Sequence, residues 1–231
     1  MKNNVPRKIL SVVYNLTLKL LVKKINTRVS ARIPKIEINE VHIRNTKLLT
    51  TREELIKHLP KQGVVGEMGV DQGHFSKSIL NLNNPKTLHL IDFWGSKRYG
   101  QEKKKLVETK FKKEIEDQRI KIDIGLSTEV VNIYPDNYFD WIYIDTDHSY
   151  KTTIKELEIY RNKIKPNGFI AGHDYLLGNW DGLVRYGVRE AVYEFCTKYN
   201  WEIVFLTSEI NNSPSFAIKE IKHQLFYRPK A

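Results

Sequence analysis

Short apolar segments alternate with helical segments from about residue 50 onward, and this alternation constrains the fold more than any other feature. Seven strands are expected, over residues 63–69, 86–92, 120–125, 139–145, 168–174, 201–206 and 215–220. A helical pattern separates each of the first five from the next, which predicts a doubly wound α/β domain with a mostly parallel sheet. The last two strands are separated by a loop alone, which predicts a C-terminal hairpin with an antiparallel strand.

Polar side chains gather where two of these strands end. The segment WIYIDTDHSY carries Asp145, Asp147 and His148, and FIAGHDY carries His173 and Asp174. In a doubly wound sheet, ligands bind outside the carboxyl ends of the strands. Carboxylates and imidazoles that converge there favour a shared cation, and Mg²⁺ needs only one or two protein carboxylates. A structural role in capping the following helices remains the alternative for Asp145 and Asp174.

A glycine-containing junction, VVGEMGVDQGHFS, follows the first strand. Gly69 and Gly73 allow a close backbone approach, and the helix that begins near His74 offers free N–H groups. Glu67 stands where the dinucleotide fingerprint has its first glycine, which favours a ligand without a pyrophosphate. Ser76, in the same helix, is a further candidate contact. An ordinary tight turn is the alternative explanation for the glycines.

The ends of the second and third strands complete a nucleotide-binding pattern. Asp92 ends the second strand and is expected either to accept both ribose hydroxyls or to cap the following turn. Trp94 is a candidate for packing on an adenine face or within the core, as is Phe93. Ser127 is expected to border the adenine.

Together these motifs resemble class I S-adenosylmethionine-dependent methyltransferases, whose fold is Rossmann-like. More narrowly, the paired D-x-D-H-S-Y and G-H-D-Y motifs resemble the metal-dependent O-methyltransferases of macrolide sugars and polysaccharide clusters. The resemblance covers about residues 50–220 and omits the N-terminal arm.

The resemblance implies a cofactor, a metal and a base. S-adenosylmethionine would contact Glu67, Gly69, Gly73, Ser76, Asp92, Trp94, Ser127 and Asp145. A divalent ion, Mg²⁺ or Mn²⁺, would bind Asp145, Asp174 and His173, although many relatives have a carboxylate at the last position. His148, assisted by Asp145, would be the general base, because imidazole has a pKa near neutrality. A turn residue bonded to Asp147 is the other interpretation of His148.

The resemblance alone suggests a sugar or glycan precursor as the hydroxyl acceptor. A small catechol or phenol is the alternative acceptor, and a non-catalytic module that binds S-adenosylmethionine is an alternative of another class. The segment LLGNWDGLVRYG, at residues 176–187, follows the fifth strand and is expected to form a lid, with Trp180 stacking on a sugar.

Positive charge is concentrated at the N-terminus. The net charge is +11, yet residues 1–35 hold nine Lys or Arg and no acidic residue. The remainder is therefore nearly neutral at +2, which argues against nucleic acid as a partner.

We divide the chain into a basic helical extension and connector (1–48) and a catalytic domain (49–231). Residues 1–24 are expected either to touch an inner membrane surface, to dock a second subunit of a homo-oligomer, or to pack on their own domain. The single cysteine, Cys196, lies in an apolar helical pattern and suits a reducing, cytoplasmic setting.

Overall fold

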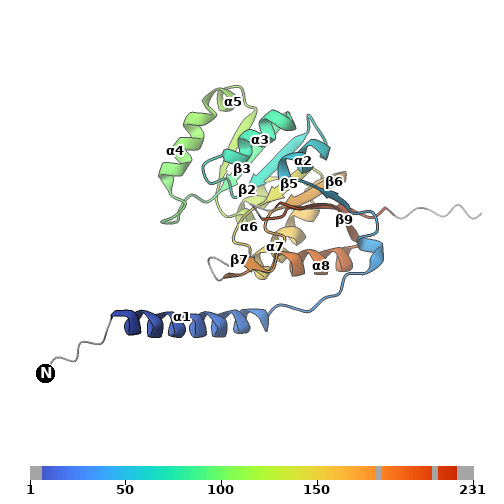
Figure 1. Cartoon of the computed structure of the whole chain (residues 1–231). Coiled ribbons are helices and arrows are strands. Elements are labelled where there is room, and N and C mark those ends of the chain that lie inside the picture. Colours follow the sequence, from blue (N-terminus) through green and yellow to red (C-terminus); the bar gives the residue numbers. More distant parts are fainter. Residues whose placement is uncertain (1–6, 180–183, 210–212, 223–231) are drawn as a thin grey trace, which may run out of the picture.

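An eight-stranded sheet forms the centre of the molecule (Figure 1). The computed structural model describes residues 7–179, 184–209 and 213–222, with side chains from residue 16 onward. The strand order is β1-β9-β10-β6-β5-β2-β3-β4. The strands are β1 (Lys47–Leu49), β2 (Val64–Met68), β3 (Thr87–Asp92), β4 (Ile120–Ile124), β5 (Phe139–Ile144), β6 (Ile164–Gly172), β9 (Trp201–Thr207) and β10 (Phe216–Glu220).

The sheet confirms the predicted Rossmann-like fold. Strands β4, β3, β2, β5 and β6 run parallel, while β10 pairs antiparallel with both β6 and β9. The chain reverses its direction of winding between β2 and β5, which places the topological switch point at their carboxyl ends. The predicted C-terminal hairpin is β9–β10.

An eighth strand corrects the expected number of seven. Strand β1 lies in the segment assigned to the connector, and it pairs parallel with β9 at the edge of the sheet. Two contacts fix the residues just before it: His42 Nδ1 lies 2.7 Å from the Trp201 carbonyl oxygen, and Thr46 Oγ1 donates to the Ile203 carbonyl at 2.7 Å. A three-residue edge strand carries too little alternation to be recognised from sequence.

Helices cover both faces of the sheet (Figure 1). Leu55, Ile56 and Ile79 from one helical layer pack on one face, and Leu157, Val192 and Phe195 from the other layer pack on the opposite face. The first layer consists of α2 (Arg52–His58), α3 (His74–Leu82), α4 (Gln101–Lys110) and α5 (Lys112–Glu116). The second consists of α6 (Ser127–Val130), α7 (Tyr150–Arg161) and α8 (Val188–Tyr199).

Local signals explain where several helices begin or break. Thr51 caps α2 and accepts a hydrogen bond from the Glu54 N–H at 3.2 Å, as the capping-box pattern predicts. The charged segment over residues 101–116 is divided into two helices, α4 and α5, at Phe111, whose side chain is buried. Cys196 is buried in α8, as expected.

The segment expected to be a lid contains a small antiparallel pair, β7 (Gly178–Asn179) and β8 (Val184–Arg185). Trp180 lies outside the described residues. Helix α1 (Arg7–Ser30) lies apart from the sheet, and its nearest described contact is with β8 (Figure 1). Among the described residues, no helix is both long and apolar enough to span a bilayer.

Candidate active site

A cavity of about 730 Å³ opens at the carboxyl ends of β2, β3 and β5, where the sheet changes its direction of winding. This is the position at which open α/β sheets bind ligands. Six of the predicted site residues line it: Gly69, Asp92, Trp94, Ser127, Asp145 and His148. The other five lie outside its lining: Glu67, Gly73, Ser76, His173 and Asp174.

The two glycines of the β2–α3 loop are required by the backbone. Gly69 has φ +83°, and a Cβ there would lie 1.8 Å from the Asp145 carbonyl oxygen. Gly73 has φ +69°, and a Cβ there would lie 2.7 Å from the Phe111 ring. A side chain would therefore clash at both positions. Its absence at Gly69 lets the loop pack directly against the end of β5.

Glu67 and Ser76 are buried behind this loop. The Glu67 side chain is 1% exposed, and burial raises its pKa to about 8, with further repulsion from Asp145. Glu67 is therefore largely protonated at neutral pH. Ser76 is fully buried in α3. Neither residue lines the cavity, so any contact with a ligand would require the loop to move.

Asp92 uses its carboxylate to hold backbone amides. Its Oδ2 accepts from the N–H groups of Val70 at 2.8 Å and Asp71 at 3.1 Å, and Oδ1 accepts from Trp94 at 2.9 Å. The capping role is thus present in the structure. Oδ2 accepts two of these bonds and Oδ1 accepts one. Oδ1 can therefore accept a further hydrogen bond from a ligand hydroxyl at the cavity wall.

The two aromatic residues after Asp92 differ in exposure. Trp94 is fully buried, and its indole N–H donates to the Asp71 carbonyl at 3.0 Å. Phe93 also lines the cavity and is 50% exposed. Phe93 is therefore better placed than Trp94 to stack its ring on the adenine of a bound nucleotide.

Glu156 is a cavity residue that the sequence interpretation missed. Ser127 and Thr146 both donate hydroxyl hydrogen bonds to its carboxylate, Thr146 at 2.9 Å. Glu156 is fully buried in α7, and burial raises its pKa to about 7. Its spacing offered a signal, because Glu156 shares the inward face of α7 with Thr153 and Tyr160.

The acid and imidazole groups that end β5 and β6 converge as predicted. His148 Nδ1 lies 2.9 Å from Asp174 Oδ2. His173 Nδ1 lies 3.5 Å from Asp145 Oδ2 and 3.5 Å from Asp174 Oδ2. His148 and Asp174 adopt left-handed backbone conformations, with φ +59° and +54°. Such conformations cluster at functional sites, where the surrounding structure maintains them.

Opposite charges dominate the electrostatics of this cluster. Burial disfavours the charged form of each histidine, yet the carboxylates outweigh it, so the pKa of His148 is raised and that of His173 is raised to about 9. Burial also opposes the charge on Asp174, but hydrogen bonds from both imidazoles hold its pKa well below the usual range. His173 is therefore positively charged at neutral pH and already compensates part of the carboxylate charge.

One oxygen or nitrogen from each of Asp145, His148 and Asp174 lies within 4.8 Å of the others, a spacing that suits a divalent cation. This donor set fits Mg²⁺ or Mn²⁺, and the predicted ligand His173 has its Nδ1 3.5 Å from the same two carboxylates. His173 Nε2 is buried without a hydrogen-bond partner among the described residues. A bound cation would compete with the imidazolium form of His173 for the same two carboxylates.

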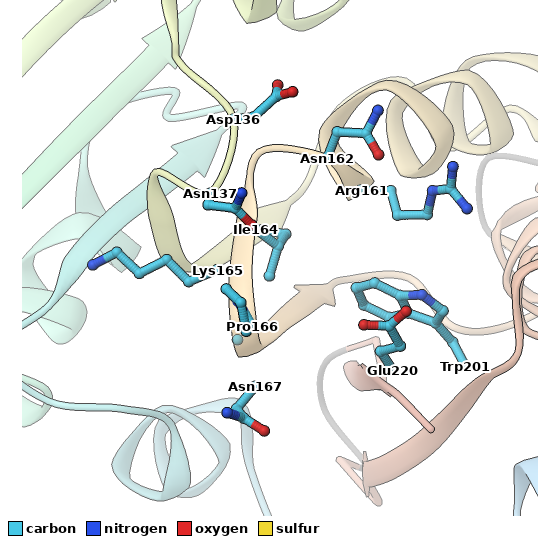
Figure 2. A pocket seen from close by; sticks show the side chains of 11 residues that line it. Asp136, Asn137, Arg161, Asn162, Ile164, Lys165, Pro166, Asn167, Trp201 and Glu220 are labelled. Carbon is cyan, nitrogen blue, oxygen red and sulfur yellow. The ribbon is translucent and has the colours of Figure 1, made fainter. Parts of the chain in front are cut away.

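A second cavity of about 400 Å³ lies at the opposite ends of β5 and β6 (Figure 2). Lys165 reaches its edge, where its ammonium group pairs with Asp140 at 2.7 Å. None of the predicted site residues lines this cavity. Asp145 and His148 of the acid–imidazole cluster instead line the cavity at the switch point.

The comparisons with known proteins agree with this geometry. Residues 67–175, somewhat less than half of the chain, match the family model described as a methyltransferase domain. The matched segment begins at Glu67 and ends just after the Asp174 strand end, so it contains both halves of the cavity. No curated protein matches the sequence significantly.

Solved methyltransferase structures share the fold. An rRNA methylase from Streptococcus thermophilus is 11% identical with a TM-score of 0.52, and the match covers 74% of this chain and 95% of that one. The tRNA methyltransferase TrmK of B. subtilis is 12% identical with a TM-score of 0.54, covering 75% and 67%. The pyocyanin biosynthetic protein PhzM is 12% identical with a TM-score of 0.56, covering 73% and 54%. Residues 67–175 thus match a methyltransferase-domain model, and the chain shares its Rossmann-like fold with these proteins.

Proposed function

We propose that the protein is an S-adenosylmethionine-dependent O-methyltransferase that acts on a hydroxyl of a sugar or glycan precursor. The carrying observation is that His148, at the wall of the cavity that the Gly69 loop also borders, has its Nδ1 2.9 Å from Asp174 Oδ2. A nucleotide beside Asp92 would leave its sulfonium end near Asp145, within reach of an acceptor held by this pair. The sugar preference rests on the motif resemblance alone.

The His148–Asp174 pair supports the proton transfer that this reaction needs. Asp174 binds Nδ1 of His148, which leaves Nε2 to take the proton of an acceptor hydroxyl. As the acceptor oxygen forms its bond to the methyl carbon, the carbon–sulfur bond breaks and S-adenosylhomocysteine leaves. The hydroxyl proton moves to His148, so charge and atoms balance.

Asp145 and Asp174 would hold a divalent ion, Mg²⁺ or Mn²⁺, which would position the acceptor and lower the pKa of its hydroxyl. His173 then has a positioning role, because it contacts both carboxylates at 3.5 Å. Before an ion binds, a histidine that contacts both acids keeps them turned toward each other.

A phenol and a nucleic acid are the alternative acceptors. A phenol or catechol would use the same base, and turnover of catechol in place of sugars would favour it. The neighbours named for rRNA and tRNA suggest nucleic acid, but the body of this chain is nearly neutral outside residues 1–35. Phosphate-tracking surfaces need concentrated positive charge along the folded domain.

The test has two stages. Calorimetry with S-adenosylhomocysteine and with NAD should give heat for the first alone, because the loop lacks the dinucleotide fingerprint. Incubation with S-adenosylmethionine, Mg²⁺ and a panel of nucleotide sugars should then add the mass of one methylene, about 14 Da, to one acceptor. Heat with S-adenosylhomocysteine but no methylation of sugars, phenols or RNA would favour a non-catalytic binding module.

A further inference from the structure

Helix α1 carries an exposed apolar stripe that the proposed reaction does not use. Leu18, Leu21, Val22, Ile25 and Val29 follow the i, i+3, i+4, i+7, i+11 spacing of one helix face. Four of the five remain exposed in the full chain: Leu18 at 42%, Leu21 at 56%, Ile25 at 50% and Val29 at 38%. Packing on the domain therefore leaves this stripe largely uncovered.

The charge of α1 and its flanking residues indicates what kind of surface would cover the stripe. Lys19 and Lys23 flank the stripe on one side and Lys24 and Arg28 on the other, while the exposed Leu16 and Leu20 lie on the opposite face. Residues 1–35 contain no Asp or Glu. A second copy of α1 would bring cations against cations, whereas an anionic surface would meet both the stripe and its basic flanks.

The position of the helix links it to the candidate active site. Helix α1 contacts β8, where Val184 is 53% exposed. The next residues along the chain lead to Tyr186, whose ring centroid lies 5.0 Å from that of His148. A surface that covers α1 would therefore lie on the side of the molecule that carries β8 (Figure 1).

We propose that α1 docks on an anionic lipid bilayer, with its apolar stripe in the interface and its basic side chains against the lipid headgroups. Docking brings the β7–β8 pair, which leads to Tyr186 beside His148, to the membrane surface, where the lipid-linked acceptor of the proposed function would be presented. The docking itself does not depend on the methyl-transfer reaction, so the two proposals fail separately.

Vesicle sedimentation of the full-length protein tests the proposal. Vesicles of phosphatidylglycerol mixed with phosphatidylcholine should bind the protein, and vesicles of phosphatidylcholine alone should bind it much more weakly. Each basic residue near an anionic surface contributes about fivefold in affinity, so Lys23→Glu with Lys24→Glu should weaken binding by about 25-fold or more. Leu21→Glu with Ile25→Glu should abolish it.

A matched control separates helix-specific binding from a net-charge effect. Lys112→Glu with Lys113→Glu changes the charge equally on an exposed helix elsewhere, and should leave vesicle binding within about twofold. Equal loss in this control, binding to both vesicle types alike, or no binding to anionic vesicles would overturn the proposal. A dimer in sedimentation velocity that Leu21→Glu with Ile25→Glu converts to a monomer would overturn it in favour of self-association. Heat with S-adenosylhomocysteine, unchanged in all variants, shows that the domain is folded.

Discussion

The Asp145 carbonyl oxygen lies 1.8 Å from the point at which a Cβ on Gly69 would stand. The loop that follows β2 is therefore pressed against the end of β5, and the two halves of the cavity share one backbone contact. Asp145 N–H also donates to the Met68 carbonyl at 2.9 Å, so the two strand ends are fixed to each other.

Replacing Gly69 by alanine should damage both stability and ligand binding. The methyl group would meet backbone at a positive φ, so the loop or the end of β5 must shift, at a cost of about 2–4 kcal/mol. Chemical denaturation measures the loss, and calorimetry should show weakened S-adenosylhomocysteine binding. Gly100→Ala is the control, because its Cβ would be 3.3 Å from the nearest atom, and it should change stability by less than about 1 kcal/mol. Equal effects in both variants would contradict this interpretation of the loop.

Removing the imidazole of His148 should abolish turnover while leaving nucleotide binding intact. General bases contribute roughly 10²–10⁴ in rate, so His148→Ala should lower kcat by that factor. Asp174→Asn should give a partial loss, because the amide no longer attracts the imidazolium that forms. Single-turnover methylation measures both. His58→Ala, on the exposed side of α2, is the matched control. Full activity of His148→Ala would assign the base elsewhere.

Glu67 should make the protein less stable as pH rises. Its pKa is about 8 in the folded state against an ordinary value near 4.5, so the folded state keeps a proton that the unfolded chain releases. The free energy of unfolding should fall between pH 4.5 and 8, by at most about 5 kcal/mol from this group. Glu67→Gln should flatten that part of the stability curve measured by urea titration. Parallel curves for the two proteins would show that Glu67 does not titrate in this window.

The sequence predicts features set by local patterns better than features set by contacts between distant segments. Apolar strands are local patterns, and they located seven of the eight strands of the sheet. The convergence of Asp145 and Asp174 followed from topology, since parallel strand ends meet at one edge. The pairing within that cluster did not follow, because the partner of His148 depends on ångström-scale packing. The sequence did not reveal the roles of Trp94 and Glu156 either, because tertiary contacts determine whether a side chain is buried.

The unequal exposure of Phe93 and Trp94 yields a paired test. Trp94 is fully buried, so Trp94→Ala should destabilise the fold by about 3–5 kcal/mol. Phe93→Ala should cost less than about 1.5 kcal/mol and instead weaken S-adenosylhomocysteine binding by roughly tenfold, because a stacked ring contributes about 1 kcal/mol or more. Thermal unfolding and calorimetry separate the two effects. Weak binding in a stable Trp94→Ala variant, with Phe93→Ala unchanged, would reverse the assignment.

Chelation tests the cation directly. If Asp145 and Asp174 hold a divalent ion, EDTA should lower methylation at least about tenfold, and Mg²⁺ or Mn²⁺ should restore it. Asp145→Asn should raise the ion concentration needed for half recovery, because it removes one of three donors. Asp147→Asn is the matched control: Asp147 binds Ser149 and Thr152 in the adjoining turn and is outside the donor group. Activity that EDTA leaves unchanged would instead assign charge compensation to His173, which lies 3.5 Å from both carboxylates.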